Sequence, residues 1–260
     1  MIGDGERNVY SRAMTHVLLC LHGWGGSKES FTELREALKN DAIRVLIPDL
    51  PGFGEEPEPP RPWTTDDYAQ WTEQWFSAQL SHLKTHDSRL TTAVLGHSHG
   101  GRIAIKMALR GNVHIDHLYL CAAAGIRHGR HFKRIVGLTL AKSGKAFLSI
   151  PGLKALQPVA QKLLYKLVRV HDYERASAVM RQTLINVTQE DLRPQIHRIT
   201  IPTDIVWGKQ DRMTPFADAL VMHQSIKGSK LHAYDGVRHR VHRDRAPEIA
   251  QIVRDTIGSH

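Results

Sequence analysis

The sequence predicts an α/β protein in which helices cover both faces of a mostly parallel sheet. Short apolar runs of strand length alternate along the chain with stretches whose apolar residues repeat at helical spacing. This alternation is typical of parallel sheets that are doubly wound by helices. It is interrupted once, between Gly125 and Ile199, by a long stretch with helical patterning and no clear strand. We therefore expect one α/β core that carries a helical insertion.

The individual elements follow from the same patterning. The predicted strands are residues 17–21, 43–47, 92–95, 117–121, 203–207 and 230–233. The predicted helices of the core are residues 29–38, 66–83, 101–109, 215–226 and 246–257, and those of the insertion are 131–146, 153–170 and 172–187. Residues 1–124 and 199–260 then form the core, and residues 125–198 form a cap over it.

The excess positive charge of the chain lies in the insertion. The whole sequence of 260 residues has a net charge of +9, and residues 126–198 hold 14 Lys and Arg against 4 Asp and Glu. A solvated helix face is one explanation of this charge. The other explanation is a basic surface that binds an acidic carrier protein or an anionic membrane. Weak contact of the cap with a membrane surface is therefore possible. No nucleic-acid motif accompanies the charge, so no nucleic-acid partner is expected.

Composition and termini indicate a soluble protein. Hydrophobic residues make up 41% of the chain and charged residues 23%, as in ordinary globular domains. The first 16 residues are polar, and the apolar run that follows is too short to cross a membrane. A cytoplasmic location is therefore expected. Cys20 and Cys121 each lie in an apolar strand-like run, which predicts reduced core residues.

A glycine-flanked serine lies between a predicted strand and a predicted helix. Residues 96–100 read Gly-His-Ser-His-Gly and fit the pattern G-x-S-x-G around Ser98. Strand, serine and helix in this order predict a nucleophile elbow, a sharp turn that exposes the serine oxygen. The serine would then lie at a helix N-terminus, which favours developing negative charge.

Further polar motifs follow the other predicted strands. The segments are His22-Gly23-Trp24-Gly25-Gly26-Ser27, Asp49-Leu50-Pro51-Gly52-Phe53-Gly54, Gly208-Lys209-Gln210-Asp211 and Asp235-Gly236-Val237-Arg238-His239. Ligands of open α/β sheets bind outside the carboxyl ends of the strands. These motifs therefore predict a common site with Ser98.

These motifs, in this order, resemble those of the α/β-hydrolase superfamily over nearly the whole chain. The resemblance implies an α/β-hydrolase fold with Ser98 as nucleophile, Asp211 as acid and His239 as base, in the family's order. It also implies an oxyanion hole formed by the backbone amides of Trp24 and His99. The segment after the strand at 117–121 contains no carboxylate, which favours Asp211 as the acid.

Other polar residues near these motifs have alternative roles. His242 competes with His239 as base, and otherwise it lines the pocket or is solvated. Substrate binding is assigned to Gly23, His97, Arg102 and Arg127. The alternative for Arg102 is a structural arginine that bridges helix and sheet.

The resemblance implies a serine hydrolase that cleaves a small-molecule carboxylic ester through an acyl-enzyme. A serine at the elbow also suits thioesters, lactones and carbon–carbon bonds of vinylogous diketones, and the ester could be anionic or carrier-bound. A binding protein that shares the fold but lacks catalysis is a further alternative. No cofactor is implied, and no metal-ligand pattern accompanies the 17 histidines.

Overall fold

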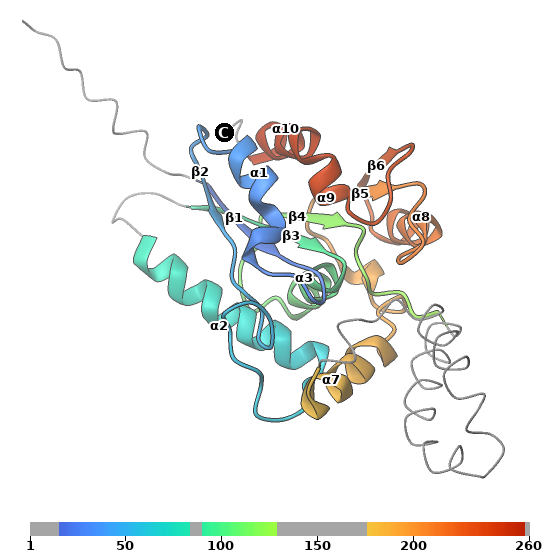
Figure 1. The fold of residues 1–260 in the computed structure, drawn as a ribbon. Coiled ribbons are helices and arrows are strands. Elements are labelled where there is room, and N and C mark those ends of the chain that lie inside the picture. The colour runs from blue at the N-terminus through green and yellow to red at the C-terminus, as the bar shows by residue number, and fades with distance from the viewer. Residues whose placement is uncertain (1–15, 84–89, 129–175, 258–260) are drawn as a thin grey trace, which may run out of the picture.

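A computed structural model of the chain describes residues 16–83, 90–128 and 176–257. Its centre is a parallel sheet whose six strands match the six predicted ones (Figure 1). The strands are β1 (His16–Leu21), β2 (Ile43–Leu46), β3 (Thr91–His97), β4 (His117–Cys121), β5 (Thr203–Gly208) and β6 (Lys230–Tyr234). Their order is β2-β1-β3-β4-β5-β6, and every neighbouring pair is parallel. The predicted fold class is confirmed.

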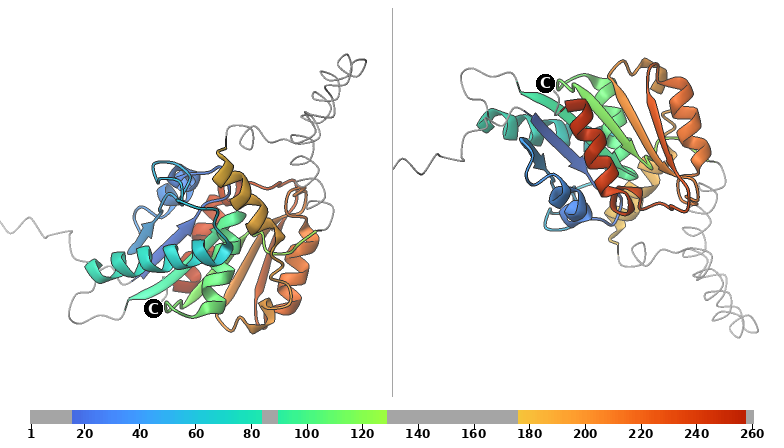
Figure 2. Two further views of the ribbon diagram at one scale, coloured as in Figure 1. Left: turned by 90° about the horizontal axis from the view of Figure 1, so that it is seen from below. Right: turned by 90° about the horizontal axis from the view of Figure 1, so that it is seen from above.

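Helices cover both faces of this sheet. On one face, α1 (Thr32–Ala37) packs against α10 (Ala246–Ile257). On the other face, α2 (Thr65–Leu83) packs against α3 (His99–Arg110), and α8 (Phe216–Ser225) packs on β5. Figure 2 shows α10 in front of the strands from above, and α2 and α3 in front of them from below. Both faces of the sheet are therefore covered, as apolar parallel strands require.

The burial of the strands explains their apolar composition. Every residue of β1, β4 and β5 is buried, and so are six of the seven residues of β3. The strand β6 at the edge is only half-buried apart from its exposed first residue. A strand covered on both faces is apolar at most positions, so its sequence shows a nearly continuous apolar run without alternation. Cys20 and Cys121 lie in this core as free cysteines, and burial raises the pKa of both thiols.

Several helix boundaries differ from those predicted. The segment predicted as one helix over 29–38 consists of a 3-10 turn, η1 (Lys28–Phe31), followed by α1. Helix α3 begins two residues earlier than predicted, directly after Ser98. The short helix α9 (Val241–Asp244) was not predicted. One turn of helix is too short to show an apolar periodicity in sequence.

The described part of the insertion contains helix α7 (Ala178–Gln189), which overlaps the helix predicted over 172–187. Ser177 caps it by accepting a hydrogen bond from the amide of Met180 at 3.1 Å. The segment just before α2 contacts this helix, because the amide of Trp63 donates to the Thr183 hydroxyl at 2.9 Å. The predicted helices over 131–146 and 153–170 lie outside the described residues, so the cap over residues 125–198 stays a prediction. In the ranges that are described, no helix is both long and apolar enough to cross a membrane.

Candidate active site

Ser98 lies at a sharp turn between β3 and α3. Its backbone has φ 53° and ψ −114°, a strained conformation for a residue other than glycine. The flanking glycines leave no room for a side chain. A Cβ atom on Gly96 would lie 2.5 Å from the carbonyl oxygen of Gly100, and one on Gly100 would lie 2.0 Å from that of Leu21. Close approach of helix and strand therefore explains both glycines of the G-x-S-x-G pattern.

The structure brings Ser98, His239 and Asp211 into one chain of hydrogen bonds. The Nε2 atom of His239 lies 3.0 Å from the Oγ atom of Ser98. Its Nδ1 atom lies 2.8 Å from the Oδ2 atom of Asp211. The carboxylate can only accept when it is ionised, so Nδ1 carries the proton and Nε2 faces Ser98 as the acceptor. The three residues predicted as nucleophile, base and acid therefore meet, although they come from three separate loops.

The carboxylate of Asp211 is fixed by its own loop. Its Oδ1 atom accepts the amides of Met213 at 2.7 Å and Thr214 at 3.2 Å, and its Oδ2 atom accepts the Thr214 hydroxyl at 2.8 Å. Burial by itself would raise the pKa of Asp211, but the hydrogen bond and charge of His239, the Met213 amide and the Thr214 hydroxyl hold the pKa below its usual value. The carboxylate is therefore kept ionised and pointed at the imidazole. Sequence reasoning did not identify Thr214, because a lone threonine three residues after an aspartate carries no specific signal.

The loop after β1 lies beside Ser98. A Cβ atom on Gly23 would lie 3.2 Å from the Cβ atom of Ser98. Among the described residues, the amides of Trp24 and His99 donate no hydrogen bond. His99 begins α3, where the first amides of a helix have no partner within the helix. Both amides assigned to the oxyanion hole thus belong to segments that adjoin Ser98.

His22 holds the β1 loop against the loop after β2. Its Nε2 atom accepts the amide of Leu50 at 3.0 Å, so Nδ1 carries the proton and donates to the carbonyl of Gly23 at 2.8 Å. Burial lowers the pKa of His22. A neutral imidazole thus fixes the conformation of the residue before Trp24. Sequence reasoning used His22 only as part of a motif.

His97 and His242 form a stack of imidazoles beside His239. Both side chains are buried, and their ring centroids are 3.6 Å apart. The Nε2 atom of His97 donates to the carbonyl oxygen of His239 at 2.9 Å. His242 packs edge-on against Phe31 and is not solvated. The structure therefore joins His97 to His239, and the assigned contact of His97 with substrate stays a prediction.

The two arginines assigned to substrate lie in different surroundings. Arg102 is buried, and its guanidinium donates to the carbonyl oxygen of Glu190 at 2.8 Å. Burial lowers the pKa of Arg102 to about 10. This contact bridges α3 to the segment after α7. Arg127 is exposed, and its amide lies 3.3 Å from a carboxylate oxygen of Asp191. The Arg102 side chain binds Glu190 and the Arg127 amide lies beside Asp191, so both substrate roles stay predictions.

The side chain of His99 is buried on the side of Ser98 that faces α2. Its ring packs edge-on against Trp24 and Tyr68, with centroids 5.3 and 4.9 Å away. Burial, and to a smaller extent the charge of Arg102, lowers the pKa of His99 to about 3. A neutral, aromatic wall therefore lies next to Ser98.

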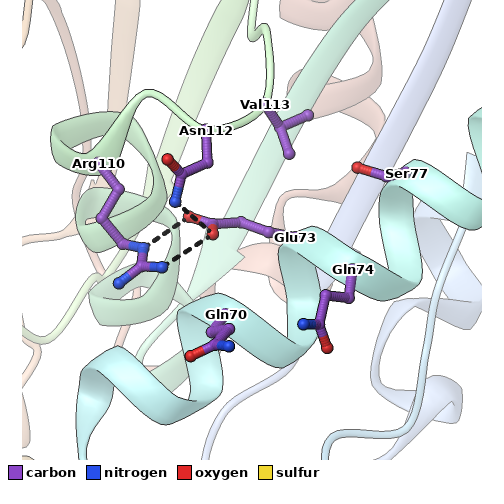
Figure 3. A pocket seen from close by; sticks show the side chains of 7 residues that line it. All are labelled: Gln70, Glu73, Gln74, Ser77, Arg110, Asn112 and Val113. Atoms are coloured by element: carbon purple, nitrogen blue, oxygen red, sulfur yellow. Dashed lines mark hydrogen bonds and ion pairs between the residues drawn. The ribbon is translucent and has the colours of Figure 1, made fainter.

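The described part of the chain forms a cavity beside the β1 loop and another beside α2. The first, of about 310 Å³, is lined by the β1 loop, the loop after β2 and α7, and its side chains include Trp24, Phe53, Glu58 and Met180. Trp24 belongs to the predicted oxyanion loop, so this cavity adjoins the site. The second, of about 590 Å³, lies between α2 and the end of α3 (Figure 3).

The second cavity contains none of the residues near Ser98. Its lining is polar, and Figure 3 shows Glu73 accepting hydrogen bonds from Arg110 and Asn112. The charged side chains of this cavity, Glu73 and Arg110, are therefore already paired with each other. Within residues 16–83, 90–128 and 176–257, no three or more His, Cys, Asp or Glu side chains are grouped so that they could hold a metal ion.

Comparisons with known proteins agree with this fold. The profile of the alpha/beta hydrolase family matches residues 18–252. Lipase 1 of Psychrobacter immobilis is 26% identical over 251 residues, which cover 92% of this chain and 76% of the lipase. The AB hydrolase superfamily protein YisY of Bacillus subtilis is 27% identical over 255 residues, covering 91% of this chain and 89% of that protein.

Solved structures give the same result for the fold. An esterase from Exiguobacterium antarcticum superposes with a TM-score of 0.71 at 24% identity, covering 94% of this chain and 92% of the esterase. A hydrolase from Pseudomonas aeruginosa superposes with a TM-score of 0.70 at 21% identity, covering 95% of this chain and 91% of that structure. The profile match spans most of the chain, and the chain therefore belongs to the alpha/beta hydrolase family.

Proposed function

We propose that this protein is a serine hydrolase that cleaves carboxylic esters through an acyl-enzyme intermediate. The observation that carries the proposal is the continuous hydrogen-bonded chain from Asp211 through His239 to Ser98, at a strained turn in front of a helix. Relatives named lipase and esterase support ester cleavage within the family.

The reaction follows from the protonation states of this chain. The Oγ atom of Ser98 attacks the ester carbonyl carbon while Nε2 of His239 takes the hydroxyl proton. The carbonyl oxygen becomes an anion, and the amides of Trp24 and His99 stabilise it by hydrogen bonds. The imidazolium then gives its proton to the departing alkoxide, which leaves as the alcohol. Water, deprotonated by His239, releases the carboxylic acid and regenerates Ser98.

Asp211 contributes by orientation and charge. Its carboxylate accepts the Nδ1 proton of His239 and so keeps Nε2 free to act as the base. When the imidazolium forms, the negative charge at 2.8 Å stabilises it. The buried donors from Met213 and Thr214 keep this carboxylate from turning toward solvent.

The nucleophile is tested by replacing Ser98 with alanine. The Ser98→Ala variant should lose ester hydrolysis on the order of 10⁴-fold, because no other group attacks the carbonyl. Labelling by a fluorophosphonate probe should disappear with it. The control is Ser77→Ala, since Ser77 is an exposed serine on α2. Wild-type-like labelling of the Ser98→Ala variant would refute the assignment.

The charge preference of the substrate is a second question. The described cavity beside Trp24 contains aromatic and thioether groups and one carboxylate, Glu58, whereas the insertion as a whole is strongly basic. If the insertion attracts substrate, raising the salt concentration should raise KM for an ester with a carboxylate on its acyl chain, because ions screen the attraction. A neutral ester of the same length is the control and should not respond.

The carboxylate of Glu58 would repel an anionic ester, whereas the basic insertion would attract it. The Glu58→Gln variant should lower KM for the anionic ester about two- to threefold, as expected for one exposed charge. Its KM for the neutral ester should stay unchanged. Equal responses of both esters to salt would mean that the basic insertion has no part in substrate choice.

A further inference from the structure

Resting on the proposed function, we propose that His97 is a positioning residue for the base, because it holds the backbone of His239 by a hydrogen bond from its Nε2 atom. His97 directly precedes the nucleophile, so the same turn that presents Ser98 also fixes the residue that takes its proton. The distance from Nε2 to the carbonyl oxygen of His239 is 2.9 Å. A carbonyl oxygen can only accept, so the proton lies on Nε2 of His97.

His239 needs such an anchor because it lies in a loop. The residue follows β6 and precedes α9, and it belongs to neither element. Its ring must meet two targets at once, the Oγ atom of Ser98 at 3.0 Å and the Oδ2 atom of Asp211 at 2.8 Å. A displacement of about 1 Å in such a site can lower a reaction rate on the order of 10²-fold. A bond from the end of a central, buried strand to the carbonyl of His239 limits that displacement.

The ring of His97 is itself held in place on more than one side. His242, on α9, stacks against it with ring centroids 3.6 Å apart and an interplanar angle of 31°. A Cβ atom on Gly23 would lie 3.0 Å from its Nδ1 atom, so the β1 loop approaches the other nitrogen. His97 has therefore little freedom to turn its Nε2 atom away from His239.

Charge also suits His97 to this role. Its pKa is held well below the usual value, first by burial and then by the neighbouring His242 and His239. Burial likewise lowers the pKa of His242 to about 3. Both rings therefore remain neutral when His239 takes the proton of Ser98, and neither repels the imidazolium that forms. A histidine supplies a donor at this position without adding a charge.

Two amide variants isolate the donor atom. The amide nitrogen of His97→Gln is separated from Cβ by the same number of bonds as Nε2 of histidine, whereas that of His97→Asn is one bond closer and falls short of the carbonyl. Both variants lose the ring that stacks on His242. We expect His97→Asn to lower kcat for a 4-nitrophenyl ester about 10- to 100-fold with little change in KM, and His97→Gln to stay within about threefold of the wild type.

A spectroscopic signal provides a readout that does not depend on turnover. The proton on Nδ1 of His239, shared with Asp211, gives a downfield proton resonance that reports the alignment of the pair. This resonance should persist in the wild type and in His97→Gln, and it should shift or broaden away in His97→Asn. His197→Phe, at an exposed histidine, serves as a control that should change neither rate nor resonance.

The outcomes separate the two proposals. Equal activity of the Gln and Asn variants, whether high or low, would overturn the role of the donor and leave only packing by the ring. A wild type that neither cleaves esters nor reacts with fluorophosphonate would refute the proposed function, and the resonance would still decide whether His97 positions His239. If His97→Asn fails to fold, His97→Phe keeps an aromatic ring without a donor and takes its place in the comparison.

Discussion

Thr214 stabilises the site through one hydroxyl group. Its Oγ1 atom donates to Oδ2 of Asp211 at 2.8 Å and also lies 3.2 Å from Nδ1 of His239. The residue is buried, and the carbonyl of Ala122 lies 3.1 Å from the same hydroxyl. The hydroxyl therefore lies where the acid and the base of the proposed mechanism meet.

The Thr214→Val variant should keep the shape of the side chain and lose the donor. A hydrogen bond to a charged group contributes roughly 1.5–3 kcal/mol. Its loss lets the Asp211 carboxylate move and raises the pKa of that carboxyl, because the hydroxyl is one of the groups that lower it. We expect kcat/KM for a neutral ester to fall about tenfold. Thr214→Ser, which restores the hydroxyl, should recover most of the activity, and a Val variant as active as wild type would contradict the role.

At the level of single residues, the sequence predicts which positions form the site but not which side chains contact each other. Ser98, Asp211 and His239 were identified because each follows a recognisable strand in a fixed order. The contact of His97 with His239 joins positions 142 residues apart and follows from no spacing in the chain. The partner of the Arg102 side chain could not be predicted either. The position of a residue in a helix determines which face of the helix it lies on, but not which segment packs against that face.

At the scale of elements, α3 carries a row of three cations that binds its neighbours. Arg102, Lys106 and Arg110 recur every four residues and so share one face of the helix. Lys106 bridges two elements, because its Nζ atom lies 2.5 Å from Glu190 after α7 and 3.0 Å from Asp66 of α2. The helix that begins at Ser98 is thereby joined to the insertion and to α2. Strand and helix patterns in the sequence could not show which charges would pair.

The Lys106→Met variant tests this bridge. It leaves the carboxylates of Glu190 and Asp66 without their shared cation, and Lys106 itself is buried. We expect the free energy of unfolding to fall by about 1–3 kcal/mol, less than for a fully buried pair because Asp66 is half-exposed. Amide hydrogen exchange in α7 should speed up at the same time.

The matched control is Lys39→Met. Lys39 pairs with Glu36 at the exposed surface of the end of α1, and such pairs contribute little. Its unfolding free energy should change by at most about 0.5 kcal/mol. If both variants lose the same stability, the bridge from α3 has no special role in holding α7.

For the whole molecule, the buried histidines link stability to pH. Among the described residues, four buried imidazoles have a pKa lowered by burial, namely His22, His97, His99 and His242. Three of them come from the loop after β1 and the turn around Ser98, and the fourth from α9. The polar packing that supports the site thus consists largely of groups that must stay neutral in the folded state.

His242 gives this linkage a defined sign and range. Burial, together with the charges of His239, Arg243 and Arg240, lowers its pKa to about 3, whereas an unfolded histidine has a pKa of about 6.5. Between these values the unfolded chain binds a proton that the folded chain does not. Stability is therefore full above about pH 6.5 and falls as the pH decreases toward 3, by about 1.4 kcal/mol per pH unit for this residue.

The His242→Phe variant should flatten this dependence, because phenylalanine retains a ring between Phe31 and His97 but binds no proton. The test is urea unfolding measured from pH 7.5 to pH 4.5. Below pH 6.5, the free energy of unfolding of the variant should fall less steeply than that of the wild type, and the two slopes should differ by about 1.4 kcal/mol per pH unit. His197→Phe replaces an exposed histidine and should leave the slope unchanged. Parallel curves for the wild type and His242→Phe would mean that His242 binds its proton in the folded state as readily as in the unfolded one, contrary to its burial between Phe31 and His97.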